Sequence, residues 1–495
     1  MAHATLLGID IGTTGVRAAV YDEAGRVVAH AAEASSPATP TSGQVEGDAD
    51  DWWRAVRTVV AQMGDRTPLT RIDAIGVTGQ APTAVLIDGN GELLRRAILW
   101  LDVRADAEAR EIEGKLGPGG AEAIGGNRMH AYYLGPKLAW LRAHELQSFE
   151  RAALVLQSHA FIVMRLTGEA ACDLSTAMLC APLFDAQSCA WSQPGADASG
   201  VPIRVLPHIA PAHQVVGSVT RAAAEATGLR AGTPVVAGGA DFAASALGAG
   251  VIDEGEACLM LGTSGNLLMP MAEPHFDSRL INSHHVGCDR WLALGGTLCG
   301  AALTWFRNAC APGVAWEALE QEAAGVSVET IGGLLALPYF QGERTPIWDE
   351  STRGVFFGLD LTHHRGHLYR ALLDGVALGF RHCLAVAEEH GTRFSEVVAA
   401  NGAGRSAILR QTLADALGMP LTWRDGTDAG NTVAGAALLA GIGAGALSGA
   451  HVARAWLGSG VRHEPNWRAH ERLCDVFTRR LALYVAVRGA RSTST

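Results

Sequence analysis

The sequence predicts an α/β protein of at least two domains, and three observations lead to this fold class. The chain has 495 residues, 48% of them hydrophobic, enough for two or more buried cores. In its first half, segments with a strand pattern alternate with segments of helical periodicity. A Gly-Thr-Thr-Gly loop at 12–15 returns as Gly-Thr-Ser-Gly at 262–265, which suggests a duplicated domain with its ligand between the two copies.

The first half opens with a predicted antiparallel meander whose first hairpin carries the Gly-Thr-Thr-Gly loop outwards. A helix follows, for which Asp50 or Asp51 can act as the N-cap, and then a strand that ends in Thr78-Gly79-Gln80. A later strand ends at Asp241. The expected strands of the meander are 6–10, 16–21 and 27–31, the helix is 52–63 and the following strand is 72–77.

The second half is predicted to be more helical. Apolar residues recur every fourth position from Leu368 to Leu384, which indicates a long helix that ends near His390. A second helix is expected over 406–417, directly after a Gly-rich loop, 401–404, whose backbone amides are free to face a ligand. The charge-free run 433–447 is too short to span a bilayer and predicts a buried helix.

Composition excludes several function classes. Thirty-nine Lys and Arg against 50 Asp and Glu give a net charge of −11, and without a basic cluster we expect neither nucleic acid nor membrane as a partner. Nine scattered cysteines without a CxxC pair disfavour a zinc site or a disulfide framework. No signal peptide precedes the first strand, so the sequence predicts a soluble, cytoplasmic protein with reduced thiols.

Two aspartates at strand ends are the candidates for chemistry. Asp10 ends a strand beside a loop of small residues that can approach phosphate, where a carboxylate can hold Mg²⁺; the alternative is a turn residue in a hairpin. Asp241 precedes a small apolar run that begins a helix, whose dipole would lower its pKa and keep it ionised as a general base; an N-cap role is compatible with this. Walker A, GxGxxG and GxSxG motifs give no competing assignment.

Aromatic and polar side chains gather after another predicted strand. Trp100 can pack on a sugar ring while Asp102 and Arg104 hydrogen-bond hydroxyl groups, so the cluster is a candidate carbohydrate contact. The alternative is an Asp–Arg pair that only positions a loop. The paired histidines near 284 and 363 are better explained as capping or solvated residues than as metal ligands.

Six segments together resemble the FGGY family of carbohydrate kinases, from about residue 5 to 485. The resemblance implies two domains of the ribonuclease-H/actin-like ATPase fold, 1–247 and 248–495, with ATP and sugar meeting in the cleft between them. The segments are IDIGTTGVRAAVYD (9–22), GADFAASALGAG (239–250), LGTSGN (261–266), LPYFQGERTPIWD (337–349), RGVFFGLDLTHHRGHLYRALLDG (353–375) and NGAGRSAILRQTLADALGMPL (401–421).

The resemblance also implies roles for individual residues. Asp241 matches the catalytic base, and Asp10 matches the acid associated with Mg²⁺. The first phosphate loop would be Gly12, Thr13 and Thr14, the second Gly262, Thr263 and Ser264, and the adenosine contact Gly402, Ala403, Gly404 and Arg405. We expect the acceptor to contact Gln80, Ala81, Trp100, Asp102, Asp241 and Phe242. The family resemblance is compatible with a homodimer.

Among the subfamilies, the chain is most similar to the xylulokinases, through SGQVEGDADDWWRAV (42–56), LGPKLAWL (134–141) and GERTPIWD (342–349). One departure concerns the acceptor pocket. Xylulokinases carry Met-His and glycerol kinases Arg-Glu where this chain has Ala81-Pro82, two residues without a side-chain hydrogen-bonding group.

We therefore expect ATP- and Mg²⁺-dependent phosphorylation of a primary hydroxyl on a small ketose or polyol, D-xylulose or a related pentulose. Other acceptors that fit are a pentitol, a tetritol, ribulose or gluconate. Two other classes keep the phosphate loops: an actin-like ATPase that switches a protein partner, and an inactive family member that senses sugars.

Overall fold

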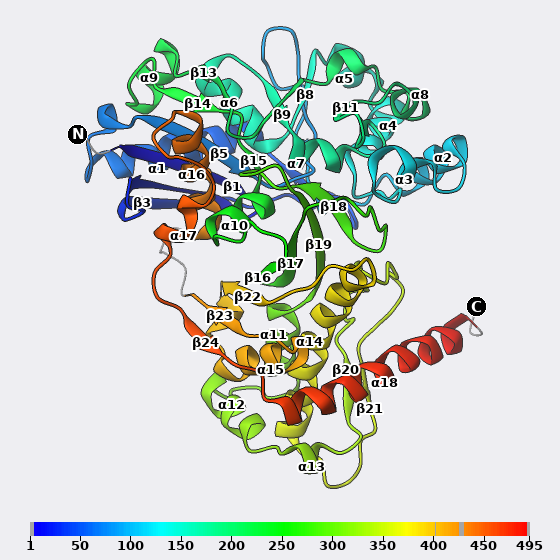
Figure 1. The fold of residues 1–495 in the computed structure, drawn as a ribbon. Helices are drawn as coiled ribbons and strands as arrows, with labels where there is room; N and C mark the ends of the chain where they lie inside the picture. Colours follow the sequence, from blue (N-terminus) through cyan, green and yellow to red (C-terminus); the bar gives the residue numbers. More distant parts are fainter. Residues whose placement is uncertain (1–3, 401, 425–429, 493–495) are drawn as a thin grey trace.

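The protein consists of two lobes, each built around a central β-sheet, as Figure 1 shows for a computed structural model of the chain. The structure describes residues 4–492 except 401 and 425–429. The first sheet has the strand order β13-β14-β5-β1-β2-β3, with β15 also paired to β5. Its strands are β1 (Thr5–Gly12), β2 (Gly15–Asp22), β3 (Val27–Ala34), β5 (Ala74–Gly79), β13 (Val215–Ser218), β14 (Pro234–Val236) and β15 (Gly239–Ala240).

β1, β2 and β3 form the antiparallel meander expected from the sequence, and β5 lies parallel to β1 on its other side. Because successive strand residues point to opposite faces, Leu7, Ile9 and Ile11 enter one core with α1 (Ala49–Gly64) and α6 (Ser158–Thr167).

The N-cap of α1 is Asp48, whose side chain accepts the N–H of Asp50 at 3.0 Å. The expectation that Asp50 or Asp51 caps this helix is therefore wrong, and both lie in its first turn. There their negative charges stabilise the positive end of the helix dipole.

The second sheet repeats the arrangement of the first. β16, β17 and β19 form an antiparallel meander, and β22 lies parallel to β16 as β5 does to β1. The full order is β18-β19-β17-β16-β22-β23-β24. The strands are β16 (Glu256–Leu261), β17 (Ser264–Met271), β18 (Ile281–His284), β19 (Trp291–Leu298), β22 (Glu396–Ala400), β23 (Leu421–Trp423) and β24 (Val461–His463).

Two helices lie between the sheets, α10 (Asp241–Gly248) and α16 (Asn431–Gly443). One buried core contains residues of both helices together with Leu6 of β1 and Leu268 of β17. α16 is the buried helix predicted from the charge-free run. α16 belongs to the last quarter of the chain but packs on β1 and β5 of the first sheet (Figure 1). The expected domain boundary after residue 247 therefore separates the two sheets, but it does not assign α16 to the lobe on which it packs.

The outer face of the second sheet is covered by α14 (Arg365–Glu389) and α15 (Ala407–Leu417), the two helices expected there. His364 caps α14 and Ser406 caps α15, each accepting a backbone N–H of the first turn. The other main helices are α2 (Asp106–Leu116), α4 (Leu134–His144), α8 (Gln193–Ser199), α9 (Arg221–Thr227), α11 (Gly300–Cys310), α12 (Trp316–Ala324) and α18 (Trp467–Ser492).

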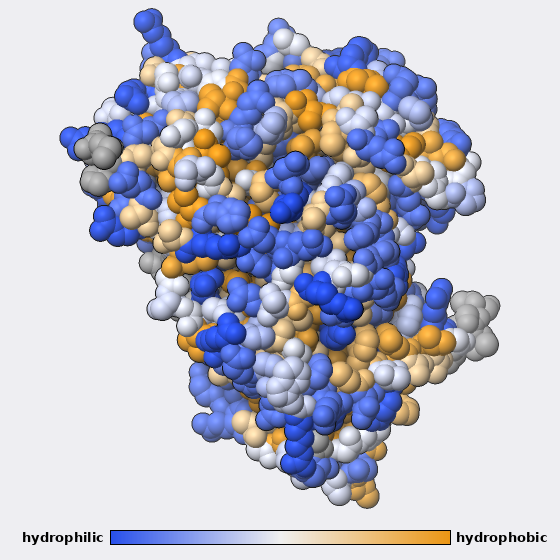
Figure 2. All heavy atoms as spheres, viewed as in Figure 1, coloured by the Kyte–Doolittle hydropathy of each residue, from blue (hydrophilic) through white to orange (hydrophobic). Residues whose placement is uncertain are grey.

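The surface carries no extended apolar band on the face drawn in Figure 2, where hydrophilic side chains surround small separate apolar groups. Within the described residues, none of the helices combines the length and the hydropathy that crossing a bilayer requires.

We expect Gly435→Ala to destabilise the protein by about 1–3 kcal/mol, because its new Cβ would lie 2.0 Å from the carbonyl oxygen of Ala244 in α10. Gly114→Ala in α2 is the matched control, since nothing lies within 4 Å of a Cβ there. It should leave stability unchanged or raise it by up to about 1 kcal/mol. Urea denaturation measures both, and equal stability of the two variants would contradict the close packing of α10 on α16.

Candidate active site

Asp10 lies at the sheet edge where β1 leads into the Thr13–Thr14 turn of the first hairpin. The residue is 7% exposed, and its Oδ1 atom has no hydrogen-bond partner among the described residues. Burial, and next the charge of Asp241, raise the pKa of Asp10 to about 8, although Arg17 opposes this. An unpartnered buried carboxylate oxygen of this kind needs a cation, a donor or a proton.

Asp241 is held beside the same edge by β15. Gly239 and Ala240 pair with Thr78 and Gly79 of β5, whose Thr78 is also the partner of Asp10 in β1. The N–H of Ala240 donates to Ser175 Oγ at 3.0 Å, which fixes the start of α10. Asp10 near the end of β1 and Asp241 just after β15 therefore lie on either side of β5. Both are at the carboxyl edge, where ligands bind in sheets of this kind.

The helix dipole does not lower the pKa of Asp241 as the sequence led us to expect. Burial raises this pKa to about 6, and the Phe242 N–H, which donates to Asp241 Oδ1 at 2.7 Å, only limits the increase. The effect of desolvation on the pKa of this carboxylate is larger than the effect of one helix terminus. A carboxylate with a pKa near 6 is mostly ionised at pH 7 and accepts a proton more readily than an ordinary aspartate.

A chain of hydrogen bonds joins the Trp100 cluster to the first hairpin. Trp100 Nε1 donates to Thr13 Oγ1 at 2.9 Å, and Thr13 Oγ1 donates to Gln80 Oε1 at 3.2 Å. Gln80 Nε2 in turn donates to the carbonyl of Gly12 at 3.4 Å. Gln80 is 1% exposed, so it supports the loop from behind.

A cleft of about 770 Å³ opens between the lobes, large enough for a sugar and part of a nucleotide. Five of the residues predicted for the site line it: Ala81, Trp100, Asp241, Phe242 and Ser264. The remaining predicted residues are not among its lining residues. Two of them interact with residues of the cleft wall: the charge of Asp241 acts on Asp10, and Trp100 donates a hydrogen bond to Thr13.

Asp102 is not part of the cleft wall. It is 0% exposed, and its carboxylate accepts the N–H of Val45 at 2.6 Å and the Arg104 guanidinium at 2.7–3.0 Å. The acceptor contact predicted for Asp102 is therefore not supported by its position. The contacts fit the other interpretation, in which the Asp–Arg pair positions the Trp100 loop.

The second hairpin presents its turn as the first one does. Thr263, in the turn, and Ser264, the first residue of β17, are both exposed. The first residue of α11 holds the loop, since Gly300 N–H donates to Gly262 O at 3.0 Å. Gly402–Arg405 form a short 3₁₀ turn directly after β22, the strand beside β16. Asn401, the first residue of this Gly-rich loop, lies outside the described residues. A Cβ at Gly404 would lie 2.5 Å from Trp423 Nε1, so glycine allows the loop to pass this ring.

Comparison with known proteins decides the family. Models for the N-terminal and C-terminal domains of the FGGY family of carbohydrate kinases match residues 5–248 and 257–444. This chain belongs to the FGGY family. It is thus a carbohydrate kinase, and the predicted fold of two actin-like ATPase domains is confirmed.

Relatives of this FGGY kinase cover nearly the whole chain. A xylulose kinase of Escherichia coli (strain K12) is 34% identical over 443 residues, 88% of this chain and 90% of that protein. Crystal structures of a xylulose kinase from Rhodospirillum rubrum and a xyloylose kinase from Brucella ovis each give a TM-score of 0.91, with 33% and 30% identity. They cover 98% of this chain and 99% and 100% of theirs.

The sequence did not single out the residues that close the cleft from both lobes. His130 Nε2 and Glu350 Oε1 are 3.1 Å apart, and the Arg344 guanidinium lies 5.0 Å from the centre of the Tyr132 ring. Arg344 lies within the GERTPIWD segment and Glu350 directly follows it, but the sequence marks this segment only as a family motif. Strand and helix periodicity gives no signal for contacts between two loops 210 or more positions apart.

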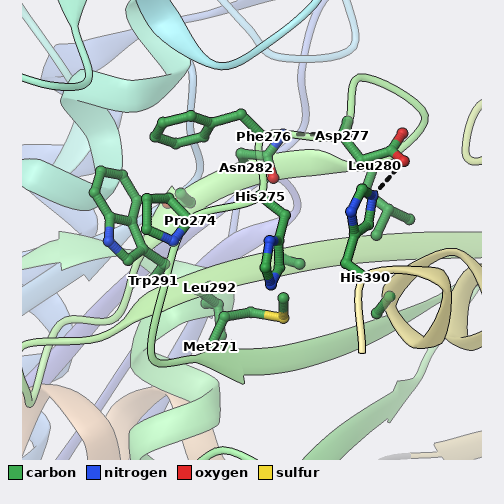
Figure 3. A pocket seen from close by; sticks show the side chains of 13 residues that line it. Met271, Pro274, His275, Phe276, Asp277, Leu280, Asn282, Trp291, Leu292 and His390 are labelled. Carbon is green, nitrogen blue, oxygen red and sulfur yellow. Dashed lines mark hydrogen bonds and ion pairs between the residues drawn. The ribbon is translucent and has the colours of Figure 1, made fainter. Parts of the chain in front are cut away.

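A second cavity lies near the edge of the second sheet, away from Asp241. Figure 3 shows it between Trp291, Phe276 and His275, with His390 bonded to Asp277 at 2.8 Å. At about 20 Å³ it holds no more than a water molecule, so the cleft is the better substrate site of the two.

Asp10→Asn should stabilise the enzyme without its ligands, increasingly so from pH 5 to pH 9. A pKa raised from 3.8 to about 8 means that wild-type stability is fully present below pH 3.8 and is lost as pH rises through 8, whereas asparagine has no charge to bury. We expect a gain of a few kcal/mol at pH 9, at about 1.4 kcal/mol per pKa unit. Thermal unfolding of both proteins against pH measures it, with Asp65→Asn at the exposed end of α1 as control. A difference independent of pH would contradict the burial of this charge.

Proposed function

We propose that this FGGY kinase transfers the γ-phosphoryl group of ATP to a primary hydroxyl of a ketopentose, with D-xylulose as the first acceptor to test. The single observation that carries the proposal is Asp241, a half-buried carboxylate of raised pKa in the wall of a cleft between two Gly-Thr hairpins. The relatives named xylulose kinases support the choice of sugar.

In this mechanism Asp241 accepts the proton of the attacking hydroxyl. Its backbone position is fixed by Ser175 and the β15–β5 pairing, so little reorganisation is needed when the acceptor arrives. Trp100 supplies a flat apolar face for the sugar, and its indole is oriented by Thr13. Ala81 and Phe242 complete the apolar part of the wall.

The phosphates of ATP are proposed to lie between the two hairpins. Backbone N–H groups and hydroxyls of 12–14 and 262–264 would bind phosphate oxygens, because glycine and threonine leave these donors accessible. The turn at 402–405 is proposed to contact the adenosine. Binding between two lobes would also exclude water from the transferred group.

Asp10 is the proposed residue for Mg²⁺. Its unpartnered Oδ1 fits a hydrated cation, and no group of three or more His, Cys, Asp or Glu side chains among the described residues offers a protein cage. When bound, Mg²⁺ neutralises charge on the phosphates. The cation would also lower the pKa of Asp10 and relieve the repulsion from Asp241.

The alternatives are less well supported. An actin-like ATPase needs no acceptor wall beside the base, whereas here Trp100, Tyr132 and Phe242 provide one. An inactive sensor would not need Asp241 in the cleft. The homodimer and the cytoplasmic location suggested by the sequence stay predictions.

Asp241→Asn should lower kcat by about 10²–10⁴ while ATP binding stays within about twofold, because the variant keeps the shape of the side chain but accepts no proton. Steady-state rates and nucleotide titration measure both effects. Asp289→Asn, an exposed aspartate between β18 and β19, serves as control. Unchanged turnover of Asp241→Asn would remove Asp241 from the mechanism.

The wild-type rate should rise with pH through about 6 and then level off, since the base must lose its proton to act. A panel of D-xylulose, ribulose, pentitols, tetritols and gluconate, assayed by ADP formation, tests the choice of acceptor. Phosphorylation of another sugar in preference to every pentulose would contradict the proposed substrate.

A further inference from the structure

The composition of the chain marks one buried basic residue as unusual. The sequence has 37 arginines and only two lysines, Lys115 and Lys137. Lys115 lies on the surface of α2, where it pairs with Glu111 at 2.7 Å. Lys137 is 0% exposed and is the one lysine of the LGPKLAWL segment, a motif to which the mechanism gives no role.

The ammonium of Lys137 bonds to backbone, not to a carboxylate. Its Nζ donates to the carbonyl of Leu99 at 2.8 Å and to that of Pro82 at 3.4 Å. Among the described residues it makes no ion pair within 4 Å, and it lies 5.9 Å from the centre of the Tyr132 ring. A single side chain therefore joins three separate segments of the chain.

Each of these segments forms part of the acceptor wall. Leu99 precedes Trp100, Pro82 follows Ala81, and Tyr132 is itself in the wall. The Tyr132 hydroxyl donates to the carbonyl of Ala81 at 3.3 Å, so the segments are also bonded to one another. Lys137 lies behind the wall, where it can set the spacing between the Trp100 and Ala81 sides.

This position is unfavourable for a cation on stability grounds. Lys137 lies in the first turn of α4, near the positive end of the helix dipole, and α4 would bury an apolar side chain there at lower cost. Burial lowers the pKa of Lys137 to about 7. The charge of Asp102 opposes this decrease, and the charge of Arg104 adds to it. Arginine, the basic residue at nearly every other position of this chain, has a planar fork of donors that does not suit two converging carbonyls.

We propose that Lys137 is a positioning residue for the sugar acceptor, holding the Leu99–Trp100 and Ala81–Pro82 segments at the separation that a ketopentose requires. The proposal rests on the proposed function, in that the cleft beside Asp241 takes a sugar. Ala81 and Pro82 have no polar side chains, so the placement of their backbone by Lys137 decides the shape of this side of the pocket.

The test compares Lys137→Met with Lys115→Met, which removes the other lysine in the same way outside the cleft. We expect Lys137→Met to raise KM for D-xylulose about tenfold or more, the effect of losing two buried hydrogen bonds that hold the wall, with KM for ATP unchanged. Lys115→Met should change neither. A merely structural role would lower the thermal midpoint and active fraction of Lys137→Met and leave KM for D-xylulose at the wild-type value, and that result would overturn the proposal.

A measurement on the wild-type enzyme covers the case in which Lys137→Met does not fold. Protein labelled with ¹³C-lysine gives signals from only two side chains, and Lys115→Met assigns them. Saturation with D-xylulose should shift the Lys137 signal and leave that of Lys115 in place. Two unchanged signals in the presence of bound D-xylulose would overturn the proposal.

Failure of the proposed function would be recognised separately, because wild-type enzyme would then not phosphorylate D-xylulose. In that case the comparison of Lys137→Met with Lys115→Met uses the acceptor from the panel that the wild type does phosphorylate. The expected rise in KM and the overturning result are the same.

Discussion

The close packing of α10 against α16 is the constraint on which the site depends. Glycines let the helices and strands approach: a Cβ at Gly435 would meet the carbonyl of Ala244, and one at Gly8 would meet that of Val433. These two helices lie between the sheets, and one buried core contains residues of both helices and of both sheets. Since Asp241 is the first residue of α10, the same packing places this carboxylate, the proposed base, at the junction of the lobes.

The burial that this arrangement imposes explains the electrostatics. Two carboxylates lie beside one sheet edge, Asp10 buried and Asp241 half-buried in the cleft wall, and both have raised pKa values. In the folded protein without ligands this is unfavourable, but it suits the proposed roles, in which Asp241 accepts a proton and Asp10 meets a cation. If the proposed binding of ATP and Mg²⁺ holds, the ligands would recover the free energy that the fold loses by burying these charges, a common relation between stability and function.

The repeated sheets form the two hairpins, whereas loops without a repeat form the remaining wall of the cleft. The two sheets supply the same hairpin beside the same parallel strand, which suits a ligand such as triphosphate bound from two sides. The proposed acceptor side of the cleft has no such repeat. It is built from the Trp100 loop, the Tyr132 segment and the GERTPIWD segment, and it is held by the Trp100–Thr13 bond and by Lys137.

The sequence by itself determined the strands of the first meander, α14, α15, the buried α16 and both Gly-Thr loops, because periodicity and turn residues act over short distances. It also identified Asp241, whose place at a strand end is a local feature. Only the tertiary structure decided that Asp102 is internal, that α16 returns to the first sheet, and that burial raises the pKa of Asp241. Desolvation and contacts such as His130–Glu350 depend on what the rest of the chain brings near a residue, and no local pattern in the sequence contains that information.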